Sequence, residues 1–196
     1  RSVVIKGGML ISSLIGVENR STKDLDTTIR GFSLTHENAE SAFREIISIY
    51  VDDDVAFELV RTEDIREGDI YPCVRVFLKA NYAPMSVPIS VDVTTGDKIT
   101  PDAIEYSYPL LFDNRSISLM AYPVETILAE KIETVLSRDV ANTRPRDYYD
   151  IVMLWRLWRQ DIDLNTLRNA LSATFEKRGS MSALHGYRET MLRVAS

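Results

Sequence analysis

The hydrophobic pattern of the first 122 residues consists of short apolar runs separated by polar stretches. These runs are rich in β-branched residues, and glycine or proline stands near their ends, which is typical of strands joined by turns. The pattern predicts strands over residues 2–6, 55–61, 73–82 and 88–95. The stretch 24–30, DLDTTIR, also begins as a strand would.

Two segments of the same part have helical periodicity. Residues 9–16 form an apolar run after a glycine pair, and we expect a helix there that turns at Gly16. Residues 38–51 predict an amphipathic helix, which buries its apolar face in a globular protein. That face consists of Ala42, Ile46, Ile49 and Tyr50.

After Tyr122 the pattern becomes helical throughout. The first helix has proline at its start, glutamate in its first turn and arginine at its end, and the third ends at Gly179. The three helices are expected over residues 123–138, 144–160 and 163–179. We therefore expect an α/β (α+β) protein, with a mixed β-sheet flanked by helices in residues 1–122 and a helical region in residues 123–196.

The composition is that of an ordinary soluble globular protein, with 45% hydrophobic residues in a chain of 196. No apolar run is long enough to cross a bilayer, and residues 1–10 lack the order of a signal peptide. We expect a cytoplasmic protein with no membrane partner. Because the chain starts with Arg1 rather than Met and a strand follows at once, we also expect a further segment to precede it.

The net charge of −6 argues against a general nucleic-acid coat, because phosphate binding depends largely on lysine and arginine. The charge is distributed unevenly. Residues 1–122 contain 12 basic and 19 acidic side chains, whereas residues 123–196 contain 11 and 10. A polyanion is therefore expected to bind the C-terminal part more readily.

Any metal site in this chain has to use carboxylates. A single cysteine excludes a cysteine-built zinc site, and two histidines make a histidine-rich site improbable. Asp24 and Asp26 are two positions apart, so they would share one face of a strand. Their charges repel unless a cation or proton lies between them, and oxygen ligands suit Mg²⁺.

A third acid, Asp92, lies in the apolar run 88–95, where a charge without a partner is costly. If its strand neighbours that of Asp26, three carboxylates converge. Each acid also has an ordinary interpretation, since solvated aspartates are common at turns and strand ends. Likewise, Gly7 and Gly8 either form a tight turn or let a helix N-terminus approach an anion.

The order of five segments is the most specific feature of the sequence. The segments are IKGGMLIS, NRSTKDLDTTIRG, ISVDVTTGDKITP, YPVETILAEKIETVLSR and NTRPRDYYDIVML. Together they resemble the successive motifs of the AbiEii/AbiGii-type toxin family, whose members are minimal nucleotidyltransferases of the DNA polymerase β-like superfamily. The resemblance spans residues 4 to about 155 and implies a nucleotidyltransferase fold.

The resemblance implies roles for matching residues in the first part of the chain. Asp24 and Asp26 match the D-x-D metal ligands of the family. Asp92 matches the third acid, which binds metal or helps to deprotonate the attacking hydroxyl. Gly7 and Gly8 match the glycine pair that faces the nucleotide phosphates.

Further roles concern the helices. Lys131 matches a lysine that meets the triphosphate, and Asp147 matches the acid of the last motif. Arg146 stands where a lysine is often found and is expected to bind nucleotide. Met9 replaces the serine or threonine that commonly follows the glycine pair, and Ser12, one turn on, offers a hydroxyl instead.

Several of these helical residues have simpler interpretations. Lys131 lies near glutamates and by itself would be a solvated helix residue. Asp147 would stabilise a helix by lying near its N-terminus. Tyr148 and Tyr149 are interpreted as packing residues, and Trp155 and Trp158 are expected in the helical core.

The family resemblance implies Mg²⁺-dependent transfer of a nucleoside monophosphate from an NTP to an acceptor such as tRNA. It implies the toxin of a type IV-like toxin–antitoxin or abortive-infection system, with a cognate antitoxin as partner. Metal carboxylates and a cation suffice for such chemistry, which needs charge neutralisation and positioning. The alternatives are transfer to a protein hydroxyl, as in AMP-transferring relatives, and a non-catalytic nucleotide- or partner-binding module.

Overall fold

Strands dominate the described part of the chain up to Ala121, and the elements described after it are helical. The computed structural model describes residues 2–31, 33–65, 73–112 and 114–194. The strands in these residues are β1 (Ser2–Lys6), β2 (Leu25–Arg30), β3 (Ala56–Asp64), β4 (Cys73–Tyr82), β5 (Met85–Thr95), β6 (Ile104–Pro109) and β7 (Ser116–Ala121). The helices are α1 (Gly7–Ile15), α2 (His36–Ile47), α3 (Val124–Arg138), the 3-10 turn η1 (Asp139–Ala141), α4 (Pro145–Trp158), α5 (Leu164–Lys177), α6 (Met181–His185) and α7 (Tyr187–Val194).

The chain divides into two compact units. The first unit comprises residues 1–9 and 22–97, and the second comprises residues 10–21 and 98–196. Helix α1 begins in the first unit and continues into the second. The two units are described separately below.

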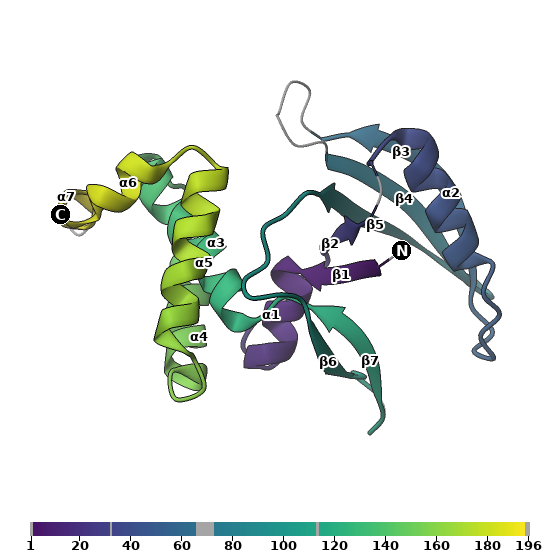
Figure 1. Cartoon of the computed structure of the whole chain (residues 1–196). Helices are drawn as coiled ribbons and strands as arrows, with labels where there is room; N and C mark the ends of the chain where they lie inside the picture. The colour runs from purple at the N-terminus through teal and green to yellow at the C-terminus, as the bar shows by residue number, and fades with distance from the viewer. Residues whose placement is uncertain (1, 32, 66–72, 113, 195–196) are drawn as a thin grey trace. The chain divides into compact units, whose positions relative to one another are not determined.

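The first unit is a mixed β-sheet with strand order β3-β4-β5-β2-β1 (Figure 1). Strands β2 and β5 run parallel, whereas the other neighbouring pairs are antiparallel. Helix α2 lies along one face of β3, β4 and β5 in Figure 1. Because α2, β3 and β4 connect β2 to β5, strands far apart in the sequence become neighbours at the middle of the sheet.

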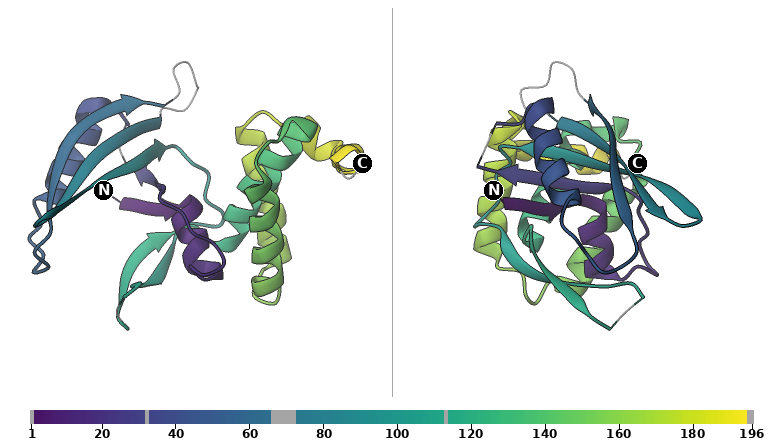
Figure 2. Two further views of the ribbon diagram at one scale, coloured as in Figure 1. Left: turned by 180° about the vertical axis from the view of Figure 1, so that it is seen from behind. Right: turned by 90° about the vertical axis from the view of Figure 1, so that its right-hand side faces the viewer.

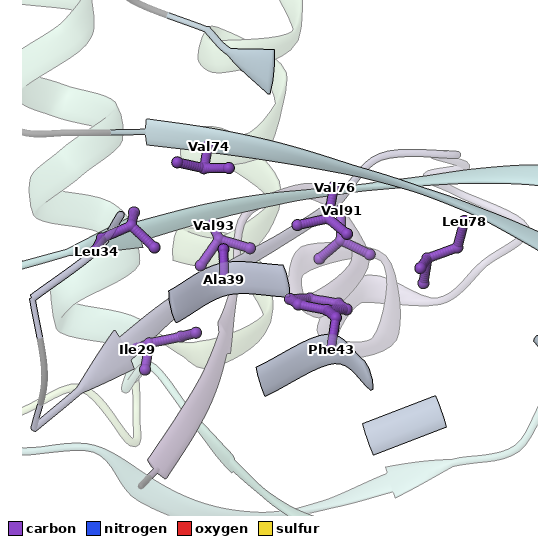
Figure 3. Packing of buried hydrophobic residues seen from close by; sticks show 9 residues of the cluster. All are labelled: Ile29, Leu34, Ala39, Phe43, Val74, Val76, Leu78, Val91 and Val93. Carbon is purple, nitrogen blue, oxygen red and sulfur yellow. The ribbon is translucent and has the colours of Figure 1, made fainter. Parts of the chain in front are cut away.

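Alternating residues of the central strands form the core of this unit. Val74 and Val76 of β4 and Val91 and Val93 of β5 are each at most 2% exposed. Figure 3 shows Phe43 of α2 facing this layer of valines. The rest of the cluster comprises Ile29, Leu34, Ala39 and Leu78. The opposite face of the same strands therefore remains available for polar residues.

The second unit contains the antiparallel pair β6–β7 and the C-terminal helices. Helix α3 contacts both α4 and α5, and the left view of Figure 2 shows these helices alongside one another. Ile127 and Leu128 of α3, Leu154 of α4 and Phe175 of α5 are buried in the second unit. In the part of the chain that the structure describes, no helix combines the length and apolar character needed to cross a bilayer.

Most of the predicted elements are confirmed, but the predicted face of the second helix is wrong. Helix α2 buries Ala39, Ala42 and Phe43, whereas Ile46 is 42% exposed. The helix ends at Ile47, so the remaining residues of the predicted face, Ile49 and Tyr50, lie beyond it and are exposed. The apolar stripe therefore follows the i, i+3, i+4 pattern from Ala39.

Two further expectations are corrected. Trp155 is 42% exposed, so it is not part of the helical core. Trp158 is half-buried, and its indole Nε1–H donates a hydrogen bond to the carbonyl oxygen of Leu14 at 3.2 Å. Asp24 does not lie in the strand with Asp26, because β2 begins at Leu25.

Candidate active site

Four charged residues occupy directly opposed positions on four neighbouring strands of the first unit. Lys6 of β1 lies opposite Asp26 of β2, which in turn lies opposite Asp92 of β5. Arg75 of β4 lies opposite Asp92 on its other side. Directly opposed residues point to the same face of a sheet, so cation, carboxylate, carboxylate and cation follow one another across it. We call these four residues the charged row.

Asp26 is a partly buried carboxylate close to the start of α1. The backbone N–H of Gly8 donates a hydrogen bond to its Oδ2 at 3.3 Å. Burial raises the pKa of Asp26 above its usual value, and the negative charges of Asp92 and Asp24 raise it further. The hydrogen bond from Gly8 and the charge of Lys6 act in the opposite direction. Burial and neighbouring charge therefore favour either a proton or a cation at this carboxylate.

Gly7 has to be glycine for two reasons. Its φ of +64° lies in the left-handed region that side chains other than glycine rarely adopt. A Cβ atom at this position would also lie only 2.0 Å from Oδ2 of Asp26. The glycine thus lets the start of α1 approach the carboxylate closely, and the amide of Gly8 reaches it as a result.

Asp92 is bound on both of its oxygens by Arg75. The guanidinium Nε donates to Oδ1 at 2.6 Å, and Nη2 donates to Oδ2 at 2.7 Å. These hydrogen bonds raise the pKa of the Arg75 guanidinium, and it stays charged throughout the physiological range. A planar two-point contact of this kind fixes the orientation of a carboxylate as well as neutralising it.

Asp24 is an exposed residue just before β2. Its charge acts on both Asp26 and Arg75, which places it within electrostatic range of the charged row. Among the described residues, no group of three or more histidine, cysteine, aspartate or glutamate side chains is arranged to hold a metal ion. However, Mg²⁺ is usually held by one or two carboxylates and completes its shell with water and phosphate. The adjacent carboxylates of Asp26 and Asp92 fit this requirement.

The second unit contains a separate buried ion network. Lys131 of α3 contacts Asp147 at 2.6 Å and Asp150 at 2.9 Å, both on α4. Asp150 is fully buried and also accepts hydrogen bonds from Nε and Nη2 of Arg20 at 3.0 and 3.4 Å. The Oδ2 atom of Asp147 is buried and has no hydrogen-bond partner within the described residues. Since an ammonium group has three donors, Lys131 keeps one beyond its two carboxylates.

Arg20, Asp150 and Arg75 were not predicted from the sequence. Asp147 and Asp150 are three residues apart, and such spacing on a helix places both carboxylates on one face, where a shared cation can reach them. Arg75 lies in an apolar strand, as Asp92 does, and a charge in such a run needs a partner. These signals were present, but neither identifies the partner.

The remaining predicted residues lie in the second unit. Ser12 is buried, and its hydroxyl donates a hydrogen bond to the backbone carbonyl oxygen of Arg20. Arg146 is exposed in the first turn of α4. Their roles in nucleotide binding, like those of Lys131 and Asp147, stay predictions.

Comparisons with solved structures identify the fold class. The structure is similar to that of an antigenic nucleotidyltransferase-like protein from Paracoccidioides brasiliensis, with 21% identity and a TM-score of 0.53 over 94% of this chain and 84% of that one. It is similar to JHP933 from Helicobacter pylori, with 13% identity and a TM-score of 0.53 over 98% and 84%. The antibiotic-resistance factor ANT(2'')-Ia gives 11% identity and a TM-score of 0.50 over 95% and 88%. The chain therefore has the nucleotidyltransferase fold.

The sequence assigns the chain to a particular family within this class. Residues 1–195 match the family described as nucleotidyl transferase AbiEii toxin, type IV toxin–antitoxin system. The chain belongs to this family, as the order of its motifs predicted. The comparison with curated proteins gave no match.

Proposed function

We propose that this protein transfers a nucleoside monophosphate from an NTP to an acceptor hydroxyl with the help of Mg²⁺. The observation that supports this best is the placement of Asp26 and Asp92 side by side in the charged row. Two carboxylates that close repel each other unless a cation lies between them. Their oxygen ligands suit Mg²⁺, which supplies charge neutralisation for phosphoryl transfer when it is bound.

The proposed reaction forms one bond to phosphorus and breaks one, and a proton leaves the acceptor. The acceptor hydroxyl loses its proton and its oxygen attacks the α-phosphorus of the NTP. The bond between that phosphorus and the bridging oxygen of the leaving group breaks, and pyrophosphate departs. Such a step depends on in-line positioning and on stabilisation of negative charge rather than on a covalent enzyme intermediate.

In our proposal, residues of the first unit bind the cation, contact the phosphates and accept the proton. Asp24 and Asp26 bind the cation, and the start of α1 at Gly7 and Gly8 faces the phosphates. Asp92 binds the cation or accepts the proton of the attacking hydroxyl, and Arg75 positions its carboxylate for either task.

Residues of the second unit add positive charge in the proposal. Lys131 contributes a cation to triphosphate binding, with Asp147 holding its ammonium group in place at 2.6 Å. Arg146, exposed at the start of α4, and Ser12 are proposed as further nucleotide contacts. Within residues 123–196, basic side chains slightly outnumber acidic ones, which suits a polyanionic acceptor.

We further propose that the acceptor is RNA such as tRNA and that a cognate antitoxin controls the activity in the cytoplasm. The family description as the toxin of a type IV toxin–antitoxin system supports the antitoxin. Modification of tRNA would stop translation, which is a direct route to growth arrest.

The test is transfer of label from each α-³²P-labelled NTP in turn. Purified protein is incubated with Mg²⁺ and total tRNA, and RNA and protein are resolved separately. We expect label on RNA from one preferred NTP, and none with the Asp24→Ala/Asp26→Ala variant. Label on protein instead would move the acceptor to a protein hydroxyl. Label on neither, from protein that still arrests growth, would contradict transfer to tRNA and favour another acceptor or a non-catalytic mechanism.

Replacement of Arg75 should change the affinity for a divalent cation. Arg75→Gln removes a positive charge that binds both oxygens of Asp92, so a cation no longer competes with the guanidinium for that carboxylate. We expect Mn²⁺, used as a calorimetric probe, to bind roughly tenfold more tightly, which corresponds to about 1.4 kcal/mol.

Arg61→Gln is the matched control for this measurement. Arg61 lies on the neighbouring strand β3, where it stacks over Phe77 and pairs with Glu63 at 2.6 Å. Removing its charge should change Mn²⁺ affinity by less than about twofold, because exposed charges are screened. An equal gain in both variants, or weaker binding in Arg75→Gln, would show that Arg75 does not compete with the cation.

A further inference from the structure

A candidate interaction surface lies on helix α4 of the second unit. The helix packs against α3 and buries Leu154, and its exposed side contains a stripe of four residues. Successive members of this stripe are three, four and three positions apart, which is the spacing of neighbours along one face of a helix. They are Tyr149, Val152, Arg156 and Arg159, and we call them the α4 stripe.

The exposed charges of this segment all have the same sign. Its two acids, Asp147 and Asp150, are buried and contact Lys131 of α3. Between Arg144 and Arg159, every exposed charged residue is an arginine. The exposed side of α4 is therefore positive in a chain whose net charge is −6. A locally positive surface of this kind attracts an anionic partner.

The arginines of the α4 stripe are also unpaired. Elsewhere in the same unit, the guanidinium group of Arg178 forms an ion pair with Glu133. By contrast, neither Arg156 nor Arg159 forms an ion pair with any residue that the structure describes. A guanidinium group has five donors in a planar fork that matches the geometry of phosphate. These donors are available to a phosphate without the loss of an existing contact.

Aromatic rings lie next to these arginines. Tyr149 belongs to the stripe, and its hydroxyl donates a hydrogen bond to the carbonyl oxygen of Asn19 at 3.0 Å, which fixes the ring. Trp155 adjoins the stripe, because it lies three positions after Val152 and four before Arg159. Both rings are exposed. Exposed rings of this kind stack on unpaired nucleic-acid bases.

The combination of charge and rings favours a nucleic-acid strand over an acidic protein. Arg146 lies three positions before Tyr149, so positive charge extends along the helix from Arg146 to Arg159. At 1.5 Å per residue this distance is about 20 Å. A nucleic-acid strand repeats both a phosphate and a flat base along such a length, whereas an acidic protein surface has no such regular repeat.

We propose that the α4 stripe, together with Trp155, binds a single-stranded segment of RNA. Arg156 and Arg159 contact phosphate oxygens, and a base stacks on Trp155. Arg146, proposed above as a nucleotide contact, adjoins the other end of the stripe, so the bound strand leads toward it. The inference deepens the proposed function, on which it rests for the expectation that this RNA is the acceptor.

The test measures RNA binding without metal, so that it does not depend on catalysis. A fluorescein-labelled single-stranded RNA dodecamer is titrated with the protein in EDTA at several salt concentrations and followed by anisotropy. We expect Arg156→Gln/Arg159→Gln to weaken binding by at least about fivefold. The slope of log affinity against log salt should become shallower by about 1.4, since each lost phosphate contact on a single strand removes about 0.7.

Arg168→Gln/Arg188→Gln is the matched control, because it removes the same charge from exposed positions of α5 and α7. It should weaken binding by less than about twofold and keep the slope. Equal weakening in the two double variants would show general electrostatic binding and overturn the proposal. Displacement of the RNA by polyglutamate as readily, per charge, as by unlabelled RNA would favour an acidic protein instead.

A measurement on the unmodified protein protects the test against a variant that does not fold. Both tryptophans of the chain, Trp155 and Trp158, lie on α4, so the intrinsic emission reports on this helix. The dodecamer should quench this emission as it binds, and RNA that binds without quenching would overturn the inference.

The outcome for the α4 stripe can be separated from that for the proposed function. If these binding experiments fail while label still reaches RNA in the transfer assay, the stripe is refuted and the proposed function stands. If RNA binds as expected but receives no label from any NTP, the stripe is supported and transfer to RNA is contradicted.

Discussion

Asp26→Asn should reduce nucleotide transfer by about 10³-fold or more while leaving the protein at least as stable as the wild type. The carboxylate lies between Lys6 and Asp92 in the charged row, where we propose that it binds the cation. An amide of the same shape cannot neutralise a divalent ion, so charge stabilisation in the transition state is lost. The labelled-NTP assay measures the first effect, and thermal unfolding in EDTA at pH 7 measures the second.

The expected stability follows from the direction of the pKa shift. Burial, together with the charges of Asp92 and Asp24, raises the pKa of Asp26 in the folded protein. The contribution of this group to stability is then fully present below the pKa of the unfolded chain and is lost as the pH rises through the folded value. At pH 7, well above the pKa of the unfolded chain, this carboxyl group therefore opposes folding, and its replacement by asparagine removes that cost.

Asp53→Asn, in an exposed loop, serves as the control for loss of one negative charge. It should leave transfer unchanged within about twofold. An Asp26→Asn protein that is folded and fully active would exclude this residue from cation binding. One that melts far below the wild type would assign Asp26 a structural role instead.

Asp150→Asn should lower the stability of the protein by about 3–5 kcal/mol, the usual cost of breaking a buried ion pair. Asp150 is fully buried and binds Arg20 and Lys131 together. Its replacement leaves two cations close together with only Asp147 to compensate them. The midpoint of thermal unfolding should fall by roughly 6 to 20 °C.

The control for this stability prediction is Asp161→Asn, in the exposed turn after α4. Its unfolding midpoint should stay within about 2 °C of the wild type, since surface changes of this kind cost little. A midpoint for Asp150→Asn that equals that of the control would show that the network of Lys131, Asp147 and Arg20 tolerates the loss of its buried centre. Asp147 would then be the carboxylate that holds Lys131.

Sequence patterns predicted the elements that bury a regular apolar face. Strands β1, β4 and β5 and helices α3, α4 and α5 all combine such a pattern with clear end signals. Strands β6 and β7 were not predicted, because most of their residues are exposed and their apolar signal is weak. Helices α6 and α7 were missed for a related reason, since each is short and no more than partly buried over most of its length.

The acidic residues of the candidate site could be predicted from the sequence, but its lysine and arginine could not. Asp92 stood out because it interrupts an apolar strand. Whether its strand neighbours that of Asp26 was left open by the sequence, and the parallel pairing shows that it does. Lys6 gave no such indication, and the position of Arg75 in an apolar strand indicated a partner without identifying it. Only the register between strands decides which residue lies opposite which, and the register is fixed by the packing of the whole sheet.

The parallel pairing of β2 and β5 also has a consequence for folding during synthesis of the protein. Asp26 and Asp92 are 66 positions apart, and a parallel pair cannot close through a tight turn. Contacts between such distant segments form slowly, after the intervening chain has been ordered. During synthesis the paired carboxylates therefore cannot exist until β5 has left the ribosome. We expect nascent or truncated chains that end before β5 to be harmless to the cell that makes them.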